Sequence, residues 1–208
     1  MNHRLTTVLV LLVLTAATLR AEDTEISWSS SSGVALSNDG APFWMWAGRA
    51  GRINMDGSSW WVKPGVMYSN EFDRWLRTEV SVSGVGTVGG DSGRVLPEDL
   101  YARVLMGPVS LQAGWWDDRL GETYLPLTSG SMIRSGNAPQ LPMVRLATDD
   151  YLSLPYVGDY VQLRGGVSHG WMGNDRSTTG ALLHEKYGYI RVTPLPQAVS
   201  YTHLRAHE

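Results

Sequence analysis

The segment DLYARVLM at residues 99–106, with GP at 107–108 and VSLQAGWW at 109–116, determines the fold class of this chain. In the last segment, Val109, Leu111 and Ala113 alternate with polar or small residues, which is the period of a β-strand. The first segment alternates in the same way. Because only a Gly-Pro pair separates the two, the sequence predicts an antiparallel hairpin with a very short turn.

Other parts of the chain repeat this pattern. Clear strands are predicted at residues 75–83 and 160–168, and weaker ones at residues 43–50, 58–68, 143–147 and 184–193. Pro64 weakens one of them, because proline cannot donate a hydrogen bond to a sheet ladder. The glycine-rich residues 84–93 are predicted to form a flexible hairpin loop. Helical periodicity is nearly absent after residue 21, so the predicted fold class is all-β and antiparallel.

Each clear strand has one apolar or small face and one polar face. The first face is formed by Val109, Leu111, Ala113, Val161, Leu163 and Val167, and the second by Gln112, Gln162, Arg164 and Ser168. Such polar side chains do not suit the core of a soluble sandwich, so the pattern predicts an outer-membrane β-barrel with lipid outside and water inside. A soluble β-sandwich gives similar alternation, and periodicity alone does not separate the two folds.

The two ends of the chain differ from the rest. Residues 1–21 have the layout of a secretory signal peptide, with Arg4 before an apolar run and Ala21 at a plausible cleavage point. The apolar run at 5–19 is shorter than the roughly 20 residues of a transmembrane helix, so we expect cleavage. Residues 22–196 are predicted to form the folded domain. Residues 197–208 change character abruptly and are predicted to be a non-native, adapter-like tail.

The composition narrows the functions that remain. The chain has no cysteine, which excludes a disulfide framework and thiolate chemistry. Its net charge is −3 with scattered signs, so no basic stripe indicates nucleic-acid binding. Nine Trp and nine Tyr stand against two Phe. Trp and Tyr suit positions with one dry and one wet end, such as membrane interfaces and sugar-binding surfaces.

Several motifs in residues 135–191 resemble the Wzi family of capsule-assembly proteins. PMVRLAT at 142–148, followed by Asp150 and Tyr151, is similar to a family segment of proline, apolar residues, arginine, threonine and tyrosine. VSHGW at 167–171 followed by NDR at 174–176 resembles the family's AHGWF-x-(D/N)DR segment. Ser168 and Met172 depart from that pattern.

A further motif extends the likeness, which covers roughly residues 43–191. LHEK at 183–186 with YIR at 189–191 resembles the family's LHEK-x-x-Y-x-R strand. The resemblance implies a large outer-membrane barrel that is lectin-like, non-catalytic and helps to hold capsular polysaccharide at the cell surface. This chain is shorter than such a barrel, so we expect an N-terminal fragment that forms an open, curved sheet with unpaired edges.

Catalytic and metal chemistry find little support in the sequence. Asp117-Asp118 and Asp149-Asp150 are adjacent pairs, and neighbours on a strand point to opposite faces rather than converging across a sugar ring. His169 and His184 do not have the spacing of a metal site, and no cysteine is available. No phosphate loop or nucleophile elbow occurs. We therefore expect no enzyme activity, no cofactor and no metal.

One polar cluster has the side-chain types that recognise sugars, namely planar donors and acceptors beside an aromatic ring. It comprises His169, Trp171, Asn174, Asp175, Arg176, His184, Glu185 and Lys186. The alternative is a structural network that joins two neighbouring strands by charge-assisted hydrogen bonds. We favour this alternative, because the resemblance to the Wzi family is to its scaffold and not to a sugar site. The predicted partners are capsular or surface polysaccharide and outer-membrane lipids. Two other functions stay open, an outer-membrane porin for small solutes and a soluble periplasmic glycan hydrolase.

Overall fold

The computed structural model is a single antiparallel sheet. It describes residues 23–36, 43, 53, 57–89, 92–117, 138, 140–173, 179–195 and 198–207. The strands are β1 (Asp23–Ala35), β2 (Ser59–Asp73), β3 (Leu76–Gly89), β4 (Ser92–Met106), β5 (Val109–Trp115), β6 (Met143–Thr148), β7 (Leu152–Leu154), β8 (Gly158–Trp171), β9 (Leu182–Leu195) and β10 (Ala198–His207). The predicted all-β, antiparallel fold class is confirmed.

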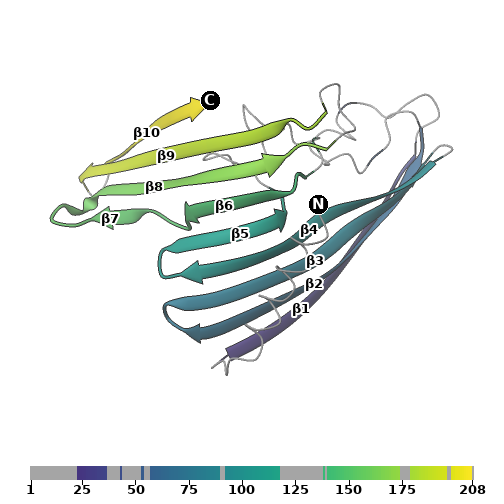
Figure 1. Cartoon of the computed structure of the whole chain (residues 1–208), viewed down its shortest axis with the longest axis horizontal. Helices are drawn as coiled ribbons and strands as arrows, with labels where there is room; N and C mark the ends of the chain where they lie inside the picture. Colours follow the sequence, from purple (N-terminus) through teal and green to yellow (C-terminus); the bar gives the residue numbers. More distant parts are fainter. Residues whose placement is uncertain are drawn as a thin grey trace.

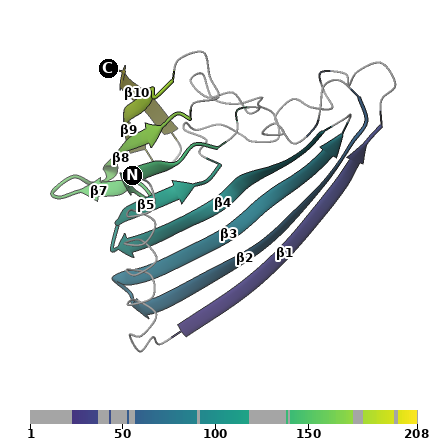
Figure 2. The same ribbon diagram turned by 45° about the vertical axis from the view of Figure 1, so that its right-hand side comes forward.

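The strands follow one another in sequence order across the sheet. The order is β1-β2-β3-β4-β5-β6-β8-β9-β10, and β7 pairs only with β8. Figures 1 and 2 show a curved sheet whose first and last strands lie at opposite edges. Within the described part of the chain, β1 and β10 do not pair, so the sheet is open, as expected.

The hairpin predicted around residues 107–108 is confirmed as β4 and β5. Leu100 pairs with Trp115, and Met106 pairs with Val109. Gly107 provides the turn with a φ of +56°, and its N–H donates to the Trp75 carbonyl at 2.7 Å. A Cβ at Gly107 would lie 2.6 Å from the Trp75 ring, so only glycine fits this close approach.

The loop predicted at residues 84–93 is wrong, because two strands continue through most of it. β3 runs to Gly89 and β4 begins at Ser92. Val85 and Thr87 continue the alternation and are buried. The intervening Gly84 and Gly86 do not need positive φ, and at Gly84 the missing side chain lets β4 approach, because a Cβ there would lie 3.3 Å from the Leu96 carbonyl oxygen. Glycine density was therefore mistaken for turn chemistry.

Some strands were not predicted, and some predictions lie outside the described residues. β1 and β7 were missed, and β10 lies within the predicted non-native tail. The predicted signal peptide and, apart from Phe43, the predicted strand at residues 43–50 lie outside the described residues. Pro64 does lie inside β2, and the β2–β3 pairing is interrupted between Val62 and Gly65. No helix among the described residues is long and apolar enough to cross a membrane.

One side of the sheet, called here the apolar face, presents apolar side chains outward. A cross-strand row of this face runs from β1 to β5 through Trp28, Val66, Val82, Leu100 and Trp115. A second row joins β5, β6 and β8 through Leu111, Leu146 and Val167. Trp28 is 82% exposed and Leu111 is 43% exposed. The predicted grouping of Val109, Leu111 and Ala113 with Val161, Leu163 and Val167 is confirmed by this register.

The opposite side, called here the polar face, is the covered one. Most of its fully or nearly buried side chains are polar, and they include Glu79, Ser81, Ser83, Thr87, Ser110, Gln112, Ser168 and Glu185. Gln162 and Arg164 lie on this face too, opposite Arg191 and Tyr189 of β9. The polar face was thus predicted correctly. The distribution of burial is the reverse of that in a soluble protein, where charged residues are almost never fully buried.

Among the residues that the structure describes, buried apolar side chains pack into a small cluster at one end of the polar face. Trp116, Leu141 and Met143 form it, and partly buried Tyr101, Met172 and Leu183 pack around them. Gly114 lies beside this cluster, where β5 ends, with a φ of +132°. The close spacing of β4 and β5 at Gly114 therefore fixes the position of Trp116.

We expect Gly114→Ala to lower the free energy of unfolding by more than about 2 kcal/mol, because strained backbone costs about 1–3 kcal/mol and the new methyl group adds a clash. A Cβ at Gly114 would lie 2.2 Å from the Leu100 carbonyl oxygen. Urea titration measures the effect. The control is Gly188→Ala, because a Cβ at Gly188 would meet nothing within 4 Å. Equal stability of the two variants would contradict the packing described.

Candidate functional site

The polar face carries ion pairs between strands, and the first reaches across β3 to join β2 to β4. The Lys63 ammonium forms ion pairs with Glu98 and with Asp99, the latter at 2.8 Å. Ser83 of β3 lies between them, where its hydroxyl donates to the Asp99 carboxylate at 3.3 Å and accepts from the Asp99 N–H at 2.9 Å. Glu98 is 1% exposed, so its charge depends on Lys63 for compensation.

A second set of ion pairs crosses from β2 to the end of β6. The Glu79 carboxylate accepts from Arg77 at 3.0 Å and from Arg103 at 3.4 Å. Arg103 also pairs with Asp149, which follows β6, and Arg77 donates to the Ser69 hydroxyl at 3.2 Å. One buried carboxylate thus holds two guanidinium groups in place, and each of these reaches a further strand or loop.

Arginine beside aromatic rings is the feature of the remaining polar face, on β5 to β9. Arg145 donates to Gln112 at 3.1 Å, and its guanidinium lies 5.0 Å from the Trp116 ring centroid. Arg191 donates to Gln162 at 3.5 Å and lies 3.7 Å from the Tyr151 ring centroid. Ser168 and Glu185 are buried between these two places and hydrogen-bond to each other at 3.4 Å.

These groups have the chemistry to recognise a polar solute. Guanidinium and amide groups offer several fixed donors, and aromatic rings offer flat faces to the C–H surface of a sugar. Tyr187 and Tyr189 add two further rings, 5.7 Å apart. A row of such groups along a sheet can bind several sugar units weakly.

The cluster predicted at residues 169–186 is divided between the two faces. His169 pairs with His184 across β8 and β9, with ring centroids 5.9 Å apart, and Trp171 meets the His169 ring edge-on at 5.0 Å. By strand alternation these three side chains and Lys186 lie on the apolar face, whereas Glu185 lies on the polar face. Asn174, Asp175 and Arg176 lie outside the described residues.

The acidic pairs considered for hydrolysis have structural contacts where they are described. Asp149 pairs with Arg103, and the Asp150 carboxylate accepts from the Tyr151 N–H at 2.7 Å. Asp117 is exposed, and Asp118 lies outside the described residues. Among the residues that the structure places, no group of three His, Asp or Glu side chains is arranged to hold a metal ion.

The sequence did not predict the side-chain contacts that cross the polar face. Tyr151, Arg145 and Arg191 take part in these contacts. The signal was present, because all residues of one parity on a strand share a face. Arg145 is one position from Val144, and Arg191 is one position from Ile190. Choosing residues by strand parity, rather than by closeness in sequence, would have found this surface.

No protein-family model, no curated protein and no solved structure matches this chain. The site is therefore interpreted from its own geometry and from the resemblance noted in the sequence.

We expect Arg103→Met to destabilise the sheet by about 3 kcal/mol, because it removes one partner of buried Glu79 and the partner of Asp149. Unfolding in urea measures this loss. A double-mutant cycle with Glu79→Gln should give a coupling energy above about 0.5 kcal/mol. The matched control is Arg74→Met, since Arg74 is exposed beside the Trp75 ring and its loss should cost less than about 0.5 kcal/mol. Strictly additive effects would contradict the contact between Glu79 and Arg103.

Proposed function

We propose that this chain forms part of an outer-membrane β-barrel that holds capsular or surface polysaccharide at the cell surface, and that it is not an enzyme. The observation that carries the membrane part is the reversed burial of the sheet. Charged Glu79, Glu98 and Glu185 are covered, while large apolar side chains such as Trp28 and Leu111 are exposed.

The energetic argument compares water with lipid as the surroundings of the apolar face. Burying one large apolar side chain is worth about 1.5–3 kcal/mol. Trp28, Val66, Val82, Leu111 and Val167 are all exposed on the apolar face, so water would leave this stabilisation unused on β1, β2, β3, β5 and β8. Lipid supplies the apolar surroundings, and the sheet ladders keep the backbone hydrogen bonds satisfied. The apolar face therefore fits an outer surface against lipid.

The polar face then becomes the inner surface of the barrel. It combines arginine and glutamine with the rings of Trp116 and Tyr151, which suits weak contacts to hydroxyl groups of a sugar. Many weak contacts along a repeating polymer gain avidity. The resemblance of residues 135–191 to the Wzi family supplies the substrate class, and the face supplies compatible chemistry.

A porin is the second candidate, and the charged ladder favours it. Arg77, Arg103 and Arg145 lie on the polar face with Glu79 and Asp99. Rows of charged side chains inside a lumen select small ions and solutes. The pairing of most of these charges with each other favours a structural or weakly binding wall over a selective channel. A soluble sandwich is favoured less, since the described strands form one sheet with no second sheet against its apolar face.

We expect Leu111→Arg to reduce insertion of the chain into lipid vesicles, because a cation on a lipid-facing strand costs about 2–4 kcal/mol near the bilayer midplane. Leu111 is exposed, so the same change in water would cost little. The measurement is the fraction of chain that floats with vesicles in a density gradient. The matched control is Leu111→Met, which keeps the side chain apolar at the same position and should leave flotation unchanged. Unchanged flotation of Leu111→Arg would contradict the lipid-facing assignment.

For the polysaccharide part, we expect deletion of the gene to release polysaccharide into the medium without stopping its synthesis. Single changes on the polar face such as Arg145→Ala or Arg191→Ala should reduce retention only partly, because avidity is shared over many contacts. The measurement is cell-bound against released polysaccharide, with a check that each variant reaches the membrane. Unchanged retention in the deletion strain, together with lost uptake of a small solute, would support the porin instead.

A further inference from the structure

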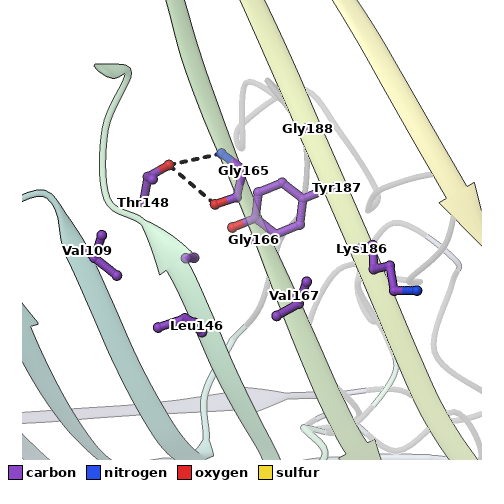
Figure 3. Close-up of a pocket in the computed structure, with 10 residues that line it drawn as sticks. Val109, Leu146, Thr148, Gly165, Gly166, Val167, Lys186, Tyr187 and Gly188 are labelled. Atoms are coloured by element: carbon purple, nitrogen blue, oxygen red, sulfur yellow. Dashed lines mark hydrogen bonds between the residues drawn. The ribbon is translucent and has the colours of Figure 1, made fainter. Parts of the chain in front are cut away.

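A groove crosses the apolar face where β6, β8 and β9 meet. It has a volume of about 760 Å³ (Figure 3). Gly165 pairs with Gly188 along its floor, so this part of the face has no side chains. A Cβ at Gly188 would meet nothing within 4 Å, which leaves the space above it open. Thr148 fixes the β6 side, where its hydroxyl accepts from the Gly165 N–H at 2.9 Å and donates to the Gly165 carbonyl at 3.3 Å.

The walls of the groove are mostly apolar, and they carry one cation. Val109 stands on the β5 side, and Leu146 pairs with Val167 along the rim. Val167 pairs in turn with Lys186 of β9, whose ammonium extends from the end of this row (Figure 3). Lys186 is the one cation among the described residues that line the groove. A hydrocarbon chain with a negatively charged end matches this combination.

A basic and aromatic cluster continues from the groove towards the ends of the strands. His184 is two residues from Lys186 on the same face and pairs with His169, and Trp171 packs edge-on against His169. Along β8 the order is therefore glycine floor, Val167, His169 and Trp171, where the strand ends. From the hydrocarbon region to the headgroups, membrane proteins show first apolar residues and then basic and amphipathic aromatic residues. The order along β8 is the same.

We propose that this groove and cluster form a binding site for an anionic phospholipid, which rests on the proposed function that the apolar face meets the membrane. The acyl chain lies in the groove over Gly165 and Gly188. The phosphate lies against Lys186, His184 and His169, with Trp171 at the level of the headgroups. Gly165 and His169 are about 13 Å apart along an extended strand, which is within the reach of one lipid molecule.

The groove can be filled without removing a single contact. In Gly188→Leu the new side chain occupies the open space, and the face stays apolar. A matched control is Gly86→Leu on the same face, where a Cβ would meet only Val62 at 3.8 Å, an ordinary contact distance. For the charge, Lys186→Gln is compared with Arg74→Gln, which removes an exposed cation at the turn between β2 and β3.

The test measures lipid bound to the full chain in a zwitterionic detergent, by native mass spectrometry, with dioleoyl phosphatidylglycerol or dioleoyl phosphatidylcholine added. The folded state of each variant is checked by its circular dichroism. We expect the wild type to retain phosphatidylglycerol at least about tenfold better than phosphatidylcholine, as loss of one charge-assisted hydrogen bond costs about that factor. Lys186→Gln should lose most of this preference, Gly188→Leu should bind neither lipid, and the two controls should behave as the wild type.

The outcomes separate the site from the proposed function. If the chain folds and stays dispersed in water without detergent and binds neither lipid, both proposals are overturned. If the chain requires detergent but binds the two lipids equally, and Gly188→Leu binds as Gly86→Leu does, only the lipid site is overturned. Displacement of phosphatidylglycerol by inorganic phosphate alone would overturn the role of the groove, because the acyl chain would then contribute nothing.

Discussion

The two-residue period of the strands is the constraint on which the whole structure depends. Each strand sends alternate side chains to opposite faces, and the pairing register joins like faces across the sheet. A shift of one residue in any pairing would place Glu79 or Gln112 among apolar neighbours and expose Val80 or Leu111 to the charged face. The separation into an apolar and a polar face is therefore what specifies the register, since no large core does so.

Cross-strand ion pairs supply part of the stabilisation that buried apolar packing supplies in soluble proteins. The buried apolar cluster around Met143 is small, yet Glu79 and Glu98 are almost fully covered. Such carboxylates stabilise the sheet only while their partners remain, because an unpaired buried charge is costly. Arg103 and Lys63 thus tie three strands together where apolar contacts are few. The same groups leave the face chemically suited to hydrated solutes.

The fold class and the two faces were predictable, because alternation is local and survives in single strands such as residues 109–115. The lengths of the strands were less predictable from the sequence. Glycine in residues 84–89 indicates a loop from composition, but paired neighbours keep it extended. The site cluster at residues 169–186 was predicted from closeness in sequence, and strand parity divides it, with Trp171 on one face and Glu185 on the other. Contacts such as that of Arg191 with Tyr151 depend on register and could not be derived from either segment alone.

The central claim is that the apolar face lies against lipid, and a single-cysteine scan of β5 tests it directly. The chain has no cysteine, so Val109, Ser110, Leu111, Gln112 and Ala113 can each be replaced by cysteine and spin-labelled without background. The measurement is the accessibility of each label to oxygen, which concentrates in lipid, and to a water-soluble nickel chelate, with the chain in vesicles. The account predicts high oxygen accessibility at positions 109, 111 and 113 and low oxygen accessibility at positions 110 and 112. Nickel accessibility that peaks at positions 109, 111 and 113 would contradict it.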